Sequence, residues 1–217
     1  MTDVAHLGGG YAESQPRPEP TAAAVLQAAK SGAAAARLVI IGGPPGVGKS
    51  ALAARLVDLM PQTFWLDKDD TAAGFILDAA GQVGLPAQAA YGTDHYWSIL
   101  RPLEYAGPVA LACANLVGRR TVLLSGGWGP ELALTEVWPQ LAAKIAPATL
   151  AVIHLDVPPL ETWRQRLAKR GSRTDSPWFE DFAQSLTQLE VWNGASRINT
   201  DQPIHQVVQD VVDTLFR

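Results

Sequence analysis

A glycine- and proline-rich turn between an apolar run and a helical segment is the feature that most constrains the fold of this chain. The run 38–41 is rich in β-branched residues and predicts a buried strand, and residues 43–50 then match the pattern G-x-x-x-x-G-K-S. A loop that wraps a polyphosphate points successive backbone N–H groups inward, and glycine permits the backbone angles that this requires. The segment therefore predicts a phosphate-binding loop between a central strand and a helix.

Roles within this loop follow from its residue types. Pro44 and Pro45 have no N–H to donate, so the donors are expected in residues 46–50, at the positive end of the following helix dipole. The lysine is expected to reach the β- and γ-phosphates, and the serine to place its hydroxyl on Mg²⁺. A glycine-rich turn that matches by chance is the alternative, and the motif predicts nucleotide binding without fixing the reaction. The expected nucleotide-binding residues are Gly43, Gly46, Val47, Gly48, Lys49 and Ser50.

The composition favours a globular protein without membrane or nucleic-acid partners. Of the 217 residues, 47% are hydrophobic, which allows a sizeable core, yet no apolar stretch approaches the roughly 20 residues of a membrane span. The net charge of −4 gives no general attraction to nucleic acid. Cys113 is the only cysteine and the first residues lack a secretory signal pattern, so we expect a reducing, cytoplasmic location.

The segment before the first strand differs from the rest of the chain. Residues 1–20 are rich in glycine and proline and predict a flexible leader. Thr21 is expected to cap an alanine-rich helix that runs to Ala35. We expect residues 21–217 to form a single domain.

Beyond residue 37, strand-like and helix-like segments alternate along the chain. This alternation predicts a three-layer α/β sandwich with a mainly parallel sheet, in which ligands bind at the carboxyl ends of the strands. The residues that directly follow each strand should therefore carry the chemistry. Strands are expected at 37–41, 63–66, 120–125, 149–155 and 196–198, and helices at 49–60, 70–81, 94–116, 131–145, 159–170, 178–191 and 203–216.

Acidic residues follow the second expected strand. Side chains two positions apart point the same way on an extended segment, so Asp67 and Asp69 are expected to face the phosphate site while Lys68 points elsewhere. Beside a nucleotide, one carboxylate can hold Mg²⁺ and the other can accept a proton from an attacking hydroxyl. The alternative is that these residues only begin a helix, with Asp69 or Asp70 as its cap.

A glycine-rich turn follows the third expected strand. Gly126 and Gly127 would let the backbone approach a small ligand closely, with the Trp128 indole as an apolar wall of the substrate site. The alternative is a strand-to-helix turn with the tryptophan packed in the core. No aspartate ends this strand, and Asp156 after the fourth strand either replaces it or caps the next helix.

Basic residues gather at the end of the helix expected at 159–170. Arg166 and Arg170 share a face at a spacing of four, and Arg173 lies in the loop beyond. On a mobile loop such groups can close over a nucleotide, exclude water and neutralise the transferring phosphoryl group. The alternative is a solvated basic helix end that the helix dipole favours.

The long segment 71–118 holds polar-tipped aromatic residues around one arginine. This combination suits a pocket for a small polar or ring-containing acceptor, with Trp97 and Arg101 as contacts. Aromatic residues at helical spacing also pack in cores, which is the alternative. His95 is the only histidine near these residues, and His154 falls within a buried strand pattern.

The pattern over residues 37–217 resembles the small-molecule kinases of the P-loop superfamily, namely shikimate and gluconate kinases, chloramphenicol phosphotransferase and zeta-toxin-like kinases. The resemblance rests on the loop at 43–50, the segment 67–69 and the basic region 166–173. It implies a five-stranded sheet in the order 2-3-1-4-5. It also implies that Asp67 lies near Mg²⁺, Asp69 at the acceptor hydroxyl, Arg166 against adenine, and Arg170 or Arg173 over the phosphates.

The functional hypothesis is ATP·Mg²⁺-dependent phosphorylation of a hydroxyl on a small molecule, a metabolite or an antibiotic. Lys49 and a lid arginine would stabilise the transferring phosphoryl group, and Asp69 would deprotonate the acceptor. Two alternatives stay open: an NTP hydrolase, in which water is the acceptor, and a nucleotide-sensing binding protein without catalysis. A guanine-reading segment of the Asn/Thr-Lys-x-Asp type does not occur in the sequence.

Overall fold

The computed structural model describes residues 15–87, 90–175 and 177–216. Its strands are β1 (Arg37–Gly42), β2 (Thr63–Asp67), β3 (Thr121–Ser125), β4 (Thr149–Leu155) and β5 (Ser196–Ile198). They form one sheet in the order β2-β3-β1-β4-β5, and all the neighbouring strands in it run parallel. The five-stranded parallel sheet and its predicted order are thus confirmed.

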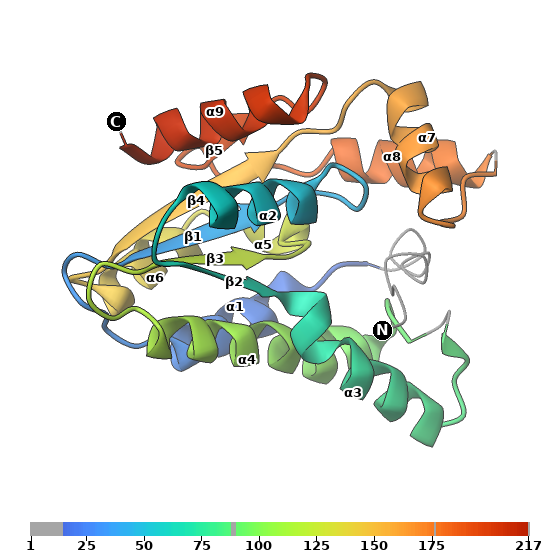
Figure 1. Ribbon diagram of the computed structural model, residues 1–217. Coiled ribbons are helices and arrows are strands. Elements are labelled where there is room, and N and C mark those ends of the chain that lie inside the picture. Colours follow the sequence, from blue (N-terminus) through green and yellow to red (C-terminus); the bar gives the residue numbers. More distant parts are fainter. Residues whose placement is uncertain (1–14, 88–89, 176, 217) are drawn as a thin grey trace.

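Helices cover both faces of this sheet (Figure 1). Within the described ranges, each of them is too short or too polar to cross a lipid bilayer. The helical elements are α1 (Pro18–Ala28), α2 (Lys49–Leu59), α3 (Lys68–Gln82), the π-helical turn η3 (Tyr96–Leu100), α4 (Arg101–Ala114), α5 (Gly129–Leu132), α6 (Val137–Ile145), α7 (Leu160–Lys169), α8 (Trp178–Thr187) and α9 (Ile204–Phe216).

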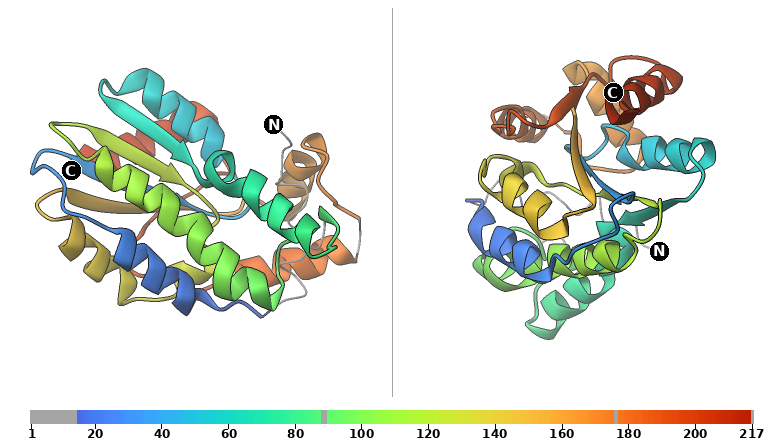
Figure 2. Two further views of the ribbon diagram at one scale, coloured as in Figure 1. Left: turned by 90° about the horizontal axis from the view of Figure 1, so that it is seen from below. Right: turned by 90° about the vertical axis from the view of Figure 1, so that its left-hand side faces the viewer.

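Side chains of the central strand β1 alternate between two cores. Leu38 and Ile40 pack with residues of α1, α4 and α6, whereas Val39 and Ile41 pack with residues of α2 and α9 on the opposite face. All four side chains are fully buried. Figure 2 shows the resulting three layers from two further directions. A continuous apolar run is what a parallel strand with both faces covered requires, and the predicted three-layer sandwich is confirmed.

The strand registers bring the carboxyl ends of four strands to one edge of the sheet. Ile41 of β1 pairs with Ser125 of β3, and Ser125 also pairs with Asp67 of β2. Gly42 at the end of β1 pairs with His154 of β4. A hydroxyl, a carboxylate and an imidazole therefore lie at the edge of the sheet where the loop at 43–50 begins.

The first helix begins earlier and ends earlier than predicted. It starts at Pro18, inside the segment 1–20 that was expected to be a flexible leader, because proline is favoured in the first turn of a helix. It ends at Ala28 rather than residue 35, since Gly32 and Ala33 donate backbone hydrogen bonds to Ile145 and Leu116 instead. Residues 1–14 of the expected leader lie outside the described residues.

Prolines divide two helices that were predicted as continuous. The segment expected at 94–116 contains η3, where the Arg101 N–H donates to Tyr96 O, and Pro102 has no N–H to continue a regular ladder. The segment expected at 131–145 is divided into α5 and α6. Pro139 lies in the first turn of α6, where its missing N–H costs nothing, and it cannot donate to Thr135 O.

Candidate functional site

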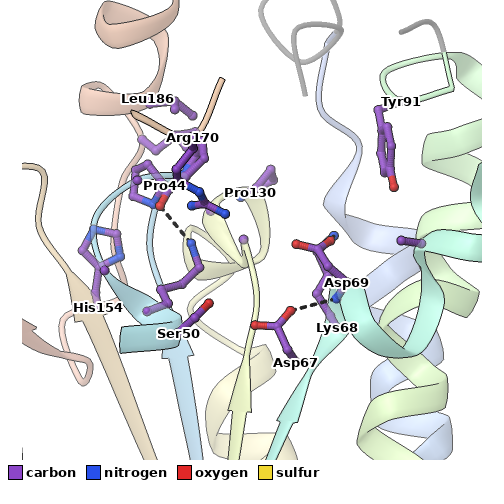
Figure 3. Close-up of a pocket in the computed structure, with 18 of the residues that line it drawn as sticks. Pro44, Ser50, Asp67, Lys68, Asp69, Tyr91, Pro130, His154, Arg170 and Leu186 are labelled. Atoms are coloured by element: carbon purple, nitrogen blue, oxygen red, sulfur yellow. Dashed lines mark hydrogen bonds and ion pairs between the residues drawn. The ribbon is translucent and has the colours of Figure 1, made fainter. Parts of the chain in front are cut away.

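A cavity of about 1500 Å³ lies at the carboxyl ends of the strands. It exceeds the roughly 300–1,000 Å³ typical of a site for one small ligand, so it has room for a nucleotide and a second molecule. Figure 3 shows the residues that face it. They come from the loop after β1, the start of α3, the turn before α5, the end of β4, α7, and the chain from α8 to residue 191.

The loop after β1 takes the shape of an anion cradle. Gly48 is left-handed, with φ of 105°, and precedes the first turn of α2, whose N–H groups have no acceptor within the helix. A Cβ at Gly48 would meet no atom within 4 Å, so its backbone is open toward the cavity. Lys49 Nζ donates to the carbonyl oxygens of Gly43 and Pro44, both at 2.8 Å. These residues fit a bound polyphosphate, as the sequence motif predicts.

Helix α7 supports the opposite side of this loop, a contact that the sequence analysis missed. Trp163 Nε1 donates to Pro45 O at 2.8 Å. Gly46 has φ of 80°, and a Cβ there would lie 2.9 Å from a methyl carbon of Leu167. The glycine is therefore needed for close packing against α7, in addition to its backbone angle.

Burial lowers the pKa of Lys49 to about 8, although the carboxylates of Asp69 and Asp67 act in the opposite direction. A polyphosphate next to this ammonium favours the charged form and raises the pKa again. A depressed pKa of this size makes binding of an anionic ligand sensitive to pH near neutrality.

We expect ATP to bind with uptake of protons near pH 8 and more weakly as the pH rises above 8. The free protein loses the Lys49 proton near pH 8, whereas the complex retains it, so raising the pH favours the free form. Calorimetric titrations of ATP in two buffers with different ionisation enthalpies measure this uptake. A protein that binds ATP with the same affinity at pH 7 and pH 9 contradicts the prediction.

Asp67 ends β2 and caps α3. Its carboxylate accepts from the Asp69 N–H at 2.9 Å and from the Ser125 hydroxyl at 2.6 Å. Burial raises its pKa. In Figure 3 the hydroxyl of Ser50 and the carboxylate of Asp67 point toward the same space. Both side chains offer the oxygen ligands that Mg²⁺ prefers, so the predicted pair fits this ion.

Asp69 lies in the first turn of α3, beside a lysine. The prediction that Lys68 points elsewhere is wrong, because residue 68 already belongs to the helix and strand alternation no longer applies. Lys68 Nζ donates to Asp69 Oδ1 at 2.6 Å. Burial alone would raise the pKa of Asp69, but this ammonium, with Lys49 and Arg170, outweighs it and holds the pKa below its ordinary value.

A buried polar network lies behind Asp69. Lys68 also donates to Glu104, at 2.6 Å, and Tyr96 donates to the second oxygen of Glu104 at 2.8 Å. Arg101 donates to the Tyr96 hydroxyl and forms a bidentate pair with Glu131 at 2.8 and 2.7 Å. Glu104 and Glu131 are almost completely buried. Arg101, which was predicted to contact substrate, lines the cavity, and its guanidinium is paired with Glu131 within this network.

Replacing Arg101 with Met should lower the free energy of unfolding by about 3–5 kcal/mol, because it leaves Glu131 buried without its partner. Denaturant titration measures the loss. Arg119→Met, at an exposed position, is the matched control, and Arg101→Met with Glu131→Leu should recover most of the stability. A loss for Arg101→Met no larger than that of the control contradicts a structural role.

Two tryptophans that were predicted to line the substrate site pack in the core. Trp128 is 1% exposed and packs edge-on against Tyr105 and Trp138. Trp97 is equally buried, with the Arg101 guanidinium over its ring at 4.9 Å. Of the glycines before Trp128, Gly127 lines the cavity. A Cβ at Gly126 would lie 3.0 Å from the Trp128 indole nitrogen, so this glycine serves packing.

The three basic residues of the expected lid have different positions. Arg170 lies above the phosphate-binding loop (Figure 3), and its charge acts on Lys49 and Asp69. Arg166 lines the cavity and donates to Thr200 O at 3.0 Å. Arg173 is exposed, pairs with Asp175 at 2.7 Å and lies over Trp178. The structure therefore does not bring Arg173 to the cavity with the other two.

His154 is a cavity residue that the sequence analysis set aside. It follows the alternation of β4 into a half-buried position next to the phosphate-binding loop, and it lies 3.6 Å from Asp156. Burial lowers its pKa. Its place one residue before the end of the strand expected at 149–155 is the sequence signal that would have identified it. Asp156 pairs with Arg197 at 2.8 Å, at the side of β5.

Comparison with known proteins identifies the fold. No protein-family model and no curated protein matches this sequence. Among solved structures, a tunicamycin resistance protein from Deinococcus radiodurans matches 81% of this chain and 95% of its own, with a TM-score of 0.55 and 18% identity. A gluconokinase from Sinorhizobium meliloti 1021 matches 82% and 90% of the two chains, with a TM-score of 0.51 and 16% identity.

A sugar kinase from Janibacter sp. HTCC2649 agrees with these two. It matches 83% of this chain and 94% of its own, with a TM-score of 0.51 and 20% identity. In each of the three comparisons the similarity extends over more than four fifths of this chain. The chain therefore has the fold of the P-loop small-molecule kinases, as the resemblance of its motifs predicts.

Proposed function

We propose that this protein transfers the γ-phosphoryl group of ATP to a hydroxyl group of a small molecule. The observation that carries the proposal is one cavity with the lysine of the G-x-x-x-x-G-K-S loop and a carboxylate of lowered pKa on facing sides. Lys49 and Asp69 both line it, and each affects the pKa of the other. The fold neighbours named above, a gluconokinase and a sugar kinase among them, support the same class of reaction.

The proposed step is an in-line displacement at the γ-phosphorus. The acceptor oxygen forms a bond to this phosphorus while the bond to the bridging oxygen of ADP breaks, and the hydroxyl proton passes to Asp69. Asp69 is suited to this role because Lys68 keeps it ionised and fixes its carboxylate. Lys49 neutralises charge on the phosphates, and Arg170 closes over them.

The remaining assignments concern the metal and the base of the nucleotide. Ser50 and Asp67 would hold Mg²⁺, which when bound neutralises charge on the β- and γ-phosphates. Arg166 would lie against adenine. We assign no role to Arg173 in the arrangement described, and it becomes a lid residue only if the loop that carries it moves toward the cavity.

An assay of ADP release tests the proposal. ADP should form at a rate that depends on ATP, Mg²⁺ and an added alcohol, and omission of the alcohol should reduce it to a slow background. ADP formation at one rate with or without any of a broad set of alcohols favours the alternative of an NTP hydrolase. Tight ATP binding with no ADP formation favours a nucleotide-sensing protein.

Replacing Lys68 with Met should move the acidic limb of the pH profile of kcat/KM to higher pH. The ammonium lowers the pKa of Asp69, so its loss raises that pKa, and the base becomes protonated at a pH where the parent protein is still ionised. Lys68→Arg should restore the profile in part. The double variant Lys68→Met with Glu104→Gln is a second control, because it does not leave a charged glutamate buried without its partner. An unchanged acidic limb in both Met variants contradicts the positioning role of Lys68.

A further inference from the structure

The acceptor side of the cavity limits which alcohols it can take. Resting on the proposed phosphotransferase function, we infer that the acceptor carries no anionic group and has an apolar body. The inference depends on how the cations of this side are paired, on the carboxylates beside them, and on the apolar wall that leads away from Asp69.

The cations on this side are already neutralised by buried carboxylates. Lys68 is paired with Glu104 at 2.6 Å, and Arg101 is paired with Glu131 through both oxygens. An acceptor carboxylate that recruited Arg101 would leave Glu131 buried and unpaired, which is costly. A carboxylated substrate therefore gains little from either cation.

The other cations of the cavity belong to the nucleotide side. Lys49 comes from the phosphate-binding loop, Arg166 lies in α7, and Arg170 directly follows this helix. A bound polyphosphate would occupy this side. The residues outside the described ranges include one lysine or arginine, Arg217.

Three carboxylates line the acceptor side: Asp67, Asp69 and Asp70. Asp67 is assigned to Mg²⁺, but the charges of Asp69 and Asp70, with Glu104 and Glu131 behind them, still exceed the positive charge of Lys68 and Arg101. A second anion placed next to Asp69 and a polyphosphate would be repelled by both. The main effect of this charge distribution is therefore to weaken the binding of anionic acceptors.

Apolar side chains continue the cavity away from Asp69. Ala73 and Leu77 follow it on the same face of α3 at spacings of four, and the Tyr91 ring lines the cavity with its centroid 5.9 Å from Lys68 Nζ. Pro130 lines the cavity from the first turn of α5, and Leu189 lines it from the chain after α8, where it packs against Gly129. This wall suits a ring or an alkyl group, and the cavity of about 1500 Å³ accommodates one beside a nucleotide.

Three probes built on one polyol separate charge from apolar surface: gluconate, gluconamide and N-benzylgluconamide. Their binding is measured by calorimetry on the full chain with Mg²⁺ and a non-hydrolysable ATP analogue. Gluconamide should bind about tenfold more tightly than gluconate, and the benzyl group should add at least about as much again. Asp70→Asn should narrow the difference between amide and carboxylate, whereas Asp78→Asn, exposed on the same helix, should not.

Each outcome bears on the inference. Equal or tighter binding of gluconate, no gain from the benzyl group, or no binding of either amide overturns it. Transfer of phosphate to gluconate in preference to the amides would overturn it while the proposed kinase function stands. Preferred binding of the amides with release of inorganic phosphate alone would support the preference of the cavity and overturn the kinase function instead.

Discussion

Replacing Asp69 with Asn should lower kcat for phosphoryl transfer by about 10²–10⁴-fold, the usual contribution of a general base, and leave ATP binding nearly unchanged. The amide keeps the shape of the carboxylate but cannot take the hydroxyl proton. ATP binding should survive because Asp69 lies across the cavity from the phosphate-binding loop and acts on Lys49 only through its charge. Steady-state kinetics and ATP calorimetry on the same preparation measure both effects.

Asp78→Asn is the matched control, since Asp78 lies on the same helix and is exposed. It should keep full activity. An Asp69→Asn variant with at least half of the parent kcat removes Asp69 as the base. A variant that loses ATP binding and catalysis together would instead make Asp69 part of the nucleotide site.

Replacing Lys49 with Met should lower kcat/KM for ATP by about 10³-fold, because one charge is lost from a buried position next to the transferring group. The pKa of about 8 shows that burial already disfavours this charge in the free protein, so the polyphosphate gains a strong interaction when it restores the charge. Met keeps the length of the side chain and removes the charge. Fold and stability should change little, since the lysine makes its two hydrogen bonds within the loop.

Lys169→Met is the control for this variant, as Lys169 is exposed at the end of α7. Kinetics with varied ATP separate the effect on KM from that on kcat. A Lys49→Met variant that retains more than about a tenth of the parent kcat/KM would show that the loop does not act on the phosphates as proposed.

The fold was predictable because its signals are local. The loop at 43–50 is a continuous motif, and the strand β1 before it is an uninterrupted apolar run with both faces buried. The alternation of strands and helices along the chain then identified the α/β fold class. Helix ends were predicted less well, since they depend on single prolines such as Pro102 and on distant contacts such as those of Gly32.

The candidate site was predictable where a residue follows a strand directly, as Asp67 does. It was not predictable where the partner is remote: Glu104 is 36 residues from Lys68, and Glu131 is 30 residues from Arg101. Both glutamates are almost completely buried, which their positions in the sequence do not indicate. For this reason the pairing of Arg101 with Glu131 was missed, and Arg101 was assigned to substrate alone.

The central claim, transfer of phosphate from ATP to an alcohol, is tested most directly by phosphorus NMR of a reaction with ATP, Mg²⁺ and an accepted alcohol. The claim predicts a new phosphate monoester resonance, coupled to the protons of the carbon that bears the hydroxyl, which grows as the ATP signals decline. It also predicts that this resonance is lost in Asp69→Asn. Formation of inorganic phosphate as the sole new product would contradict it.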